Sequence, residues 1–254
     1  MRARWDGLAE IGGVPSTLSS PGREMRATAL QGLVRDAHHY LVMSLGNDFA
    51  PLVVVVDESD WAKGGEDAPP YGIPYASHSD LELVVPADPQ RNPLIDTYAR
   101  HAPRNSAERF ADLIAIHELG HLHLRASGLD LPPGWLGEFM ATYLACCFLV
   151  EHRPEDAALW YSLSRAHAEA TTPRHRSLEM LDELYFGVGP DNYIWYQNEL
   201  TRMVEQVQAA CGLEFALRLV SAGLGPTSDG PSMLAAAERA HPGFRTWAAS
   251  LRRP

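Results

Sequence analysis

The spacing of apolar residues predicts a long helix near the N-terminus. Apolar side chains recur at intervals of three and four residues, at Leu30, Leu33, Val34, Ala37 and Leu41. This period places them on one helix face. Ser20-Pro21 precedes the segment and Gly46 follows it, as is typical of helix boundaries. We therefore expect an amphipathic helix over residues 21–45.

Two short apolar runs further along have the length and composition of strands. Residues 52–56 are β-branched after Leu52 and are bounded by Pro51 and Asp57, which predicts a buried strand. In residues 81–85, apolar side chains alternate with Glu82, which predicts a second strand with that carboxylate on the opposite face. The segment between them is rich in glycine and proline and reads as a loop.

Helical patterns dominate from residue 105 onward. Asn105 and Glu108 form a possible capping box for a helix that runs to about Ser127, where Gly128 is placed to end it. A second helix is expected from Trp135 to about His152. Further helices are expected at 154–170, 176–186, 191–211, 213–222 and 231–251, and residues 89–103 are expected to be the least structured. The order of elements predicts an α+β fold with a β-containing lobe over residues 1–128 and a helical lobe over 129–254, together forming one catalytic unit.

Composition indicates a globular protein of 254 residues, with 46% hydrophobic and 21% charged residues. The formal net charge of -11 disfavours binding to nucleic acid or to an anionic membrane. The longest apolar run, residues 139–150, is too short to span a bilayer, and residues 1–20 contain no uninterrupted apolar stretch. We expect a cytoplasmic protein. Its three cysteines, Cys146, Cys147 and Cys211, are expected to be reduced.

The strongest chemical signal is His117-Glu118-Leu119-Gly120-His121. Residues four apart lie on one helix face, so both imidazoles can reach one metal ion while Glu118 lies beside the water that the metal activates. Zinc in a catalytic site normally takes three protein ligands and keeps a fourth position for water or substrate. Glu138 is the best candidate for the third ligand, because the glycines and prolines of residues 128–134 can turn the next helix toward the first.

The residues around Glu138 add a family resemblance. Trp135, Leu136, Glu138, Ala141, Thr142 and Tyr143 match the phrase WLNEGFATY of the alanyl aminopeptidase family. Together with the HExxH motif, this pattern resembles the gluzincin metallopeptidases, a clan that also includes thermolysin. The resemblance implies a zincin-like fold in which the strand at residues 81–85 lies at the sheet edge and pairs with extended substrate.

The resemblance also implies a tyrosine that stabilises the oxyanion. Tyr196, in the segment Tyr196-Gln197-Asn198-Glu199, is the candidate, with Tyr193 as its competitor. The chain departs from the aminopeptidase pattern elsewhere. Gly137 and Phe139 replace the usual Asn and Gly, and residues 75–80 replace the Gly-x-Met-Glu-Asn box whose glutamate binds the substrate's amino terminus. Asp80 or Glu82 could replace that anchor, although a charged residue on the solvent face of an edge strand is the commoner explanation.

These residues predict a zinc-dependent metallopeptidase that acts on a peptide or protein substrate. His117, His121 and Glu138 would bind Zn²⁺, and Glu118 would serve as the general base. Two alternatives remain open: a zinc hydrolase that acts on a small non-protein amide, and a zincin-fold binding module without turnover. The sequence specifies no oligomeric state.

Overall fold

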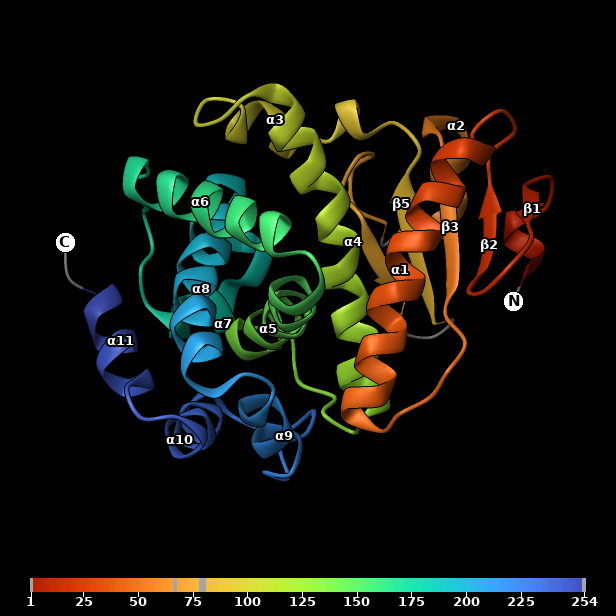
Figure 1. Cartoon of the computed structure of the whole chain (residues 1–254). Helices are drawn as coiled ribbons and strands as arrows, with labels where there is room; N and C mark the ends of the chain where they lie inside the picture. The colour runs from red at the N-terminus through yellow and green to blue at the C-terminus, as the bar shows by residue number, and fades with distance from the viewer. Residues whose placement is uncertain (1, 66–67, 78–80, 253–254) are drawn as a thin grey trace. The chain divides into compact units, whose positions relative to one another are not determined.

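The computed structural model describes residues 2–65, 68–77 and 81–252, and it confirms a mixed α+β chain (Figure 1). The chain divides into two compact units, Met1–Leu122 and His123–Pro254. The predicted division fell six residues later, after residue 128. The helix that carries the HExxH motif, α4 (Arg104–Ala126), runs through the boundary between the units.

The first unit is built on a five-stranded sheet with the order β1-β2-β3-β5-β4. Its strands are β1 (Ala9–Ile11), β2 (Ser16–Ser19), β3 (Leu52–Val56), β4 (Tyr75–Ser77) and β5 (Glu82–Pro86). The three inner strands are parallel, with Thr17 beside Val53 and Val53 beside Leu83. The two outer strands, β1 and β4, are antiparallel to their neighbours. β3 and β5 match the two strands predicted from the sequence, whereas the three shorter strands were not predicted.

Both faces of this sheet are covered. On one face, Leu18, Val54 and Val84 pack with two tryptophans in a buried apolar cluster. The alternate positions Val53 and Val55 are also buried, on the face that α1 (Glu24–Leu45) packs against. The five apolar positions predicted for α1 are all buried, and Gly46 ends the helix in the left-handed conformation. The long α1 lies along the sheet in Figure 1, and Arg26 of α1 forms an ion pair with Asp112 of α4 (Nη1 to Oδ2, 2.8 Å). This ion pair connects α1 with α4.

The remaining helices of the first unit are short. They are η1 (Arg2–Trp5), α2 (Glu58–Trp61), η2 (Ala62–Gly64), η3 (Pro89–Arg91) and α3 (Pro93–Tyr98). The last two lie in the stretch that was expected to be least structured.

The structure corrects the prediction for Glu82 and its strand. β5 is an inner strand between β3 and β4, so it is not the edge strand. The Glu82 side chain is 1% exposed, accepts a hydrogen bond from the Trp5 indole nitrogen (3.1 Å) and forms an ion pair with Arg4. It therefore lies inside the protein and not on a solvent-facing edge. Asp80 lies outside the described residues.

The second unit consists of helices. They are α5 (Trp135–His152), α6 (Pro154–Ala170), α7 (Leu178–Leu184), η4 (Tyr185–Val188), α8 (Pro190–Cys211), α9 (Glu214–Val220), α10 (Gly230–Ala240) and α11 (Phe244–Leu251). α5 is buried from Trp135 to Leu149 at nearly every position and packs against α8, which also packs against α6. Stacked and edge-on rings of Phe139, Tyr143, Phe215 and Phe244 fill the space beside α5. The predicted bounds of α5 and α6 agree with the structure.

One segment that was predicted as a single helix is divided into two. Residues 231–251 form two helices, because Pro242 and Gly243 interrupt the backbone between α10 and α11. Gly243 has φ 115°, a conformation that glycine adopts without a side-chain clash. Among the described residues, no helix combines the length and the apolar character needed to cross a membrane.

Candidate metal centre

The HExxH motif lies on α4, as its spacing predicts. His117 is 7% exposed, and its Nε2 atom lies 3.1 Å from Nε2 of His121, one turn later. Two nitrogens bound to one tetrahedral zinc ion at about 2.0–2.1 Å would be about 3.4 Å apart. The two imidazoles are therefore already spaced as ligands of a single ion.

α4 ends just after the motif by a specific hydrogen-bond pattern. The N–H of Gly128 donates to the carbonyl of Arg125, and the N–H of Leu129 donates to the carbonyl of Leu124. Gly128 itself has φ 80°. These features define a Schellman motif, in which a left-handed glycine satisfies the last carbonyls of a helix. The predicted stop at Gly128 is confirmed. The predicted start is shifted, because the helix begins at Arg104, before Asn105.

Glu118 is directed toward the edge of the sheet. Its Oε2 atom accepts a hydrogen bond from the backbone N–H of Ala76 in β4 (3.1 Å). β4 is an outer strand that pairs with β5 on one side only. Glu118 therefore lies beside a sheet edge, and that edge belongs to β4 and not to the strand predicted from the sequence.

Glu138 lies in the first turn of α5 and is 3% exposed. The Tyr185 hydroxyl donates to Oε1, and the Gln197 side-chain nitrogen donates to Oε2 (2.6 Å). Burial of a carboxylate is unfavourable unless hydrogen bonds compensate for the lost water. Both oxygens have such a donor, so the side chain is held in one orientation.

The start of α5 is fixed by a second carboxylate. Asp182 of α7 accepts a hydrogen bond from the backbone N–H of Trp135 (2.9 Å). A Cβ atom at Gly134 would overlap this carboxylate, so the position before the helix requires glycine. Burial raises the pKa of the Asp182 carboxyl from 3.8 to about 6, although the hydrogen bond from Trp135 acts in the opposite direction. Asp182 thus sets the first turn, from which Glu138 projects.

His117, His121 and Glu138 form a group that could bind a metal ion. One ligand atom from each side chain lies within 4.8 Å of the others. Two of the three side chains are buried and the third is partly buried. The structure thus brings together the three side chains that the sequence predicts as ligands.

The hydroxyl of the predicted oxyanion tyrosine has a backbone partner. Tyr196 is 1% exposed, and its hydroxyl donates to the backbone carbonyl of Ser177 (2.8 Å). Burial raises the pKa of this phenol. Tyr193 is partly buried, and its ring contacts the rings of Tyr185 and Phe186. The hydroxyl that contacts Glu138 belongs to Tyr185, which was not among the predicted site residues.

Two residues of the site were missed for different reasons. Gln197, which contacts Glu138, adjoins Tyr196 in the predicted segment Tyr196-Gln197-Asn198-Glu199. Tyr185 has no motif around it. Its signal is structural, since it is a bulky residue with φ 45°, a conformation that is unfavourable for such side chains.

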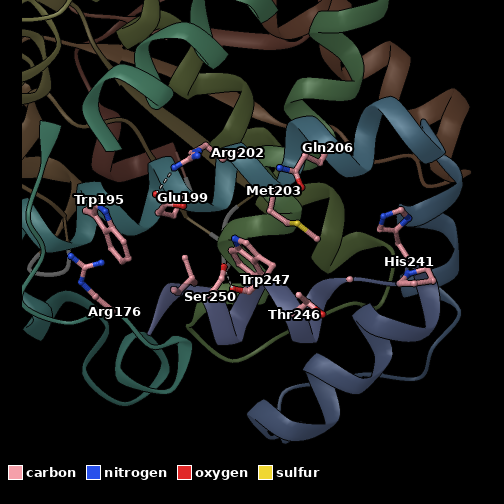
Figure 2. A pocket seen from close by; sticks show the side chains of 13 residues that line it. Arg176, Trp195, Glu199, Arg202, Met203, Gln206, His241, Thr246, Trp247 and Ser250 are labelled. Carbon is pink, nitrogen blue, oxygen red and sulfur yellow. Dashed lines mark hydrogen bonds and ion pairs between the residues drawn. The ribbon is translucent and has the colours of Figure 1, made fainter. Parts of the chain in front are cut away.

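A separate cavity of about 610 Å³ lies in the second unit (Figure 2). Figure 2 shows side chains from α8, among them Glu199 and Met203, facing Trp247 and Ser250 of α11. Arg202 forms an ion pair with Glu199 across one turn of α8 (3.0 Å). None of the described residues that line this cavity belongs to the candidate metal centre. The cavity therefore lends no support to the predicted chemistry.

The three cysteines are free, as predicted, and Cys146 and Cys147 are buried. Comparisons of the chain with protein-family models, with curated proteins and with solved structures found no significant match.

Proposed function

We propose that the protein is a zinc-dependent hydrolase of peptide bonds, with a zincin-like arrangement of its site. The observation that carries this proposal is the group formed by His117, His121 and Glu138 with a carboxylate, Glu118, between the two histidines. Two imidazoles and one carboxylate form the ligand set of several zinc hydrolases, in which the fourth position is left for water or substrate. The donor set therefore fits zinc.

Glu118 is the proposed general base. A zinc ion at this group would lower the pKa of a bound water and polarise the scissile carbonyl. Glu118 accepts the proton of the attacking water and returns it to the leaving amine. Its contact with the Ala76 N–H supports this role, because it places the carboxylate beside the strand along which an extended substrate can pair.

A peptide is the proposed substrate because β4 is an outer strand of the sheet. An edge strand offers backbone donors and acceptors to a second extended chain. β4 is such a strand, and its central residue, Ala76, already contacts the proposed base. A peptide paired with β4 would pass Glu118.

One experiment tests the chemistry directly. The zinc-loaded protein and its Glu118→Gln variant are incubated with a mixed peptide library, and new termini are identified by mass spectrometry. We expect cleavage by the wild type and a loss of about 10²- to 10⁴-fold in the variant, because the variant has no general base. Glu151→Gln, which replaces an exposed glutamate on α5, is the matched control and should cleave as the wild type does.

The other outcomes separate the alternatives. Stoichiometric zinc with no cleavage of peptides, but with hydrolysis of small amides that requires Glu118, would favour a small-amide hydrolase. Stoichiometric zinc with no hydrolysis of either class would favour a binding module. Failure to hold any transition metal would refute both hydrolases and leave the binding module.

A further inference from the structure

The cavity in the second unit has a lining with an excess of positive charge. Two arginines, Arg176 and Arg202, and one glutamate, Glu199, belong to this lining. Two guanidinium groups and one carboxylate leave a net positive charge, because arginine is always protonated in proteins. The chain as a whole has a formal net charge of -11. The charge of the lining is therefore opposite in sign to that of the whole molecule, and it favours an anionic ligand.

Arg202 has donors to offer to such a ligand. Its guanidinium forms an ion pair with Glu199, one turn earlier on α8, with 3.0 Å between Nη1 and Oε1. This contact uses one of the five N–H donors of the guanidinium. The side chain of Arg202 is 41% exposed, and an ion pair of such an accessible group is weak. Arg202 can therefore bind a second acceptor that enters the cavity.

Arg176 contributes its charge to the lining through an aromatic contact. Figure 2 shows Arg176 beside the Trp195 ring, and its guanidinium carbon lies 5.9 Å from the ring centroid. A ring attracts a cation without adding an opposite formal charge. The indole N–H of Trp247, which also belongs to the lining, is buried and has no hydrogen-bond partner among the described residues. Because an unpaired buried donor is unfavourable, both features favour an acceptor group in this cavity.

The size and the apolar part of the lining define the rest of the ligand. The volume of about 610 Å³ lies within the range of small-molecule sites, roughly 300–1,000 Å³, and far exceeds that of a lone inorganic ion. Met203 and the rings of Trp195 and Trp247 form the apolar part of the lining. The planar fork of arginine matches the oxygens of a carboxylate or a phosphate. The complementary molecule therefore has one such group on an apolar body.

We propose that the cavity between α8 and α11 is a binding site for a small organic anion. A carboxylate or phosphate group of the ligand contacts Arg202 and Arg176, and its apolar body lies against Trp247. Glu199 limits the affinity, because its charge repels the same group. This site is independent of the proposed hydrolase chemistry, since no described residue of the lining belongs to the candidate metal centre.

Calorimetric titration of the full chain with three matched probes tests the charge requirement. Phenylbutyrate has a carboxylate, phenylpropyl phosphate has a phosphate on a similar apolar body, and phenylbutyramide is the neutral analogue of phenylbutyrate. The titrations are made at low ionic strength, where screening of the charges is small. We expect saturable binding of at least one anion, and binding of the amide that is weaker by about tenfold or more. The anion that binds more tightly identifies the charged group of the ligand.

Charge variants locate the bound anion. Arg202→Gln should weaken its binding by about tenfold, because the variant lacks a charged hydrogen bond. Glu199→Gln retains an acceptor for Arg202 but loses the repulsive charge, so it should tighten binding by about two- to fivefold. Arg165→Gln is the matched control and should bind the anion as the wild type does. Arg165 is 45% exposed, forms a comparable ion pair with Glu205 and does not belong to the lining.

His121→Ala separates the cavity from the candidate metal centre, where a metal ion could also bind a carboxylate. Unchanged affinity in His121→Ala supports the cavity, and loss of binding in this variant overturns the proposal. Equal binding of the amide and the anions, or no saturable binding of either anion at millimolar concentration, would also overturn it. The same holds if Arg202→Gln binds as tightly as Arg165→Gln, or if Glu199→Gln does not tighten binding.

Discussion

The orientation of Glu138 depends on two neutral side chains. The Tyr185 hydroxyl and the Gln197 amide each donate to one oxygen of this buried carboxylate. Neutral donors orient a carboxylate without neutralising its charge, so the negative charge remains available to a metal ion. Partners of this kind in other metal sites are worth about 10- to 100-fold in metal affinity. Gln197 and Tyr185 are therefore expected to affect zinc binding without contacting the ion.

Replacement of Gln197 tests this expectation. Gln197→Leu removes the donor to Oε2 and should weaken zinc binding by about 10- to 100-fold. The affinity is measured by competition with a chromophoric chelator. Gln206→Leu, an exposed glutamine on the same helix, should bind zinc as the wild type does. Equal affinities for Gln197→Leu and Gln206→Leu would show that the hydrogen bond does not orient the ligand.

Three tyrosines compete for the role of oxyanion donor, and their hydroxyls are differently placed. If the Tyr185 hydroxyl moves from Glu138 to the developing oxyanion, Tyr185→Phe should lower kcat by about 10²-fold or more. Tyr196→Phe should instead lower the free energy of unfolding by about 1 kcal/mol, because it removes the hydrogen bond to the Ser177 carbonyl. Steady-state kinetics and urea unfolding of both variants, with Tyr193→Phe for comparison, separate these effects. A large loss of kcat in Tyr196→Phe alone would support the assignment made from the family resemblance.

The sequence predicted those site residues that depend on local spacing. His117 and His121 share a helix face because of the helical period, and this relation needs no tertiary information. The donors to Glu138 come from residues 47 and 59 positions further along the chain. The contact of these donors with Glu138 depends on how α7, η4 and α8 pack, and a local sequence pattern does not predict that packing. The burial of Glu82 was missed for the same reason, since its partners Arg4 and Trp5 are more than seventy residues away.

At the scale of the secondary-structure elements, the first turn of α5 positions Glu138, and a side chain of α7 contacts this turn. Asp182 accepts the Trp135 N–H at the helix N-terminus, where the helix dipole also favours a negative charge. Burial nevertheless raises the pKa of Asp182 to about 6. Because the pKa in the folded state lies above the ordinary value of 3.8, this group stabilises the fold fully below pH 4 and loses that contribution as the pH rises through 6.

Asp182→Asn should remove this pH dependence. The amide oxygen can still accept the Trp135 N–H, but the side chain no longer ionises. A pKa difference of about two units corresponds to at most about 3 kcal/mol, so the variant should be more stable than the wild type at pH 7.5 and should differ less at pH 4.5. Urea unfolding at the two pH values measures the difference. Glu183→Gln, an exposed neighbour on α7, should show the same pH dependence as the wild type. Parallel curves for the wild type and Asp182→Asn would contradict the assignment.

Long helices were predicted better than short strands, because a longer element carries more of its periodic pattern. α1, α5 and α6 each present several turns of periodic apolar residues, so the signal accumulates over 17 to 22 residues. β1, β2 and β4 have only three or four residues each, too few for an alternating pattern to be recognised. The place of β5 inside the sheet depends on strand order, which is set by contacts between distant segments.

At the scale of the whole molecule, the α+β class follows from the order of the elements. All five strands lie within the first 86 residues, and from α4 onward the described chain is helical. The separation of strands from helices could be predicted from the sequence, because the spacing of hydrophobic residues becomes helical after residue 105. The boundary between the units was harder to predict, because it falls within α4, whose helical pattern continues across it.

The candidate ligand set comes from two helices, so metal binding at this group would be linked to folding. His117 and His121 belong to α4 and Glu138 belongs to α5, so the complete set exists only when both helices are formed. An ion that binds the folded state alone stabilises it by mass action, by about 2.7 kcal/mol when its free concentration is a hundred times its dissociation constant. For a protein of this size, that corresponds to a rise in Tm of about 5–10 °C.

Thermal unfolding with buffered zinc and with a chelator should reveal this linkage. The wild type should show the rise in Tm, and His121→Ala should lose most of it, because two remaining ligands bind zinc far more weakly than three. His152→Ala is the control for adventitious binding, since His152 is an exposed histidine at the end of α5, and its Tm should respond to zinc as the wild type does. Equal shifts in His121→Ala and the wild type would mean that zinc binds elsewhere on the protein. A Tm that zinc leaves unchanged in all three proteins would mean that the three side chains lie close together without serving as a metal centre.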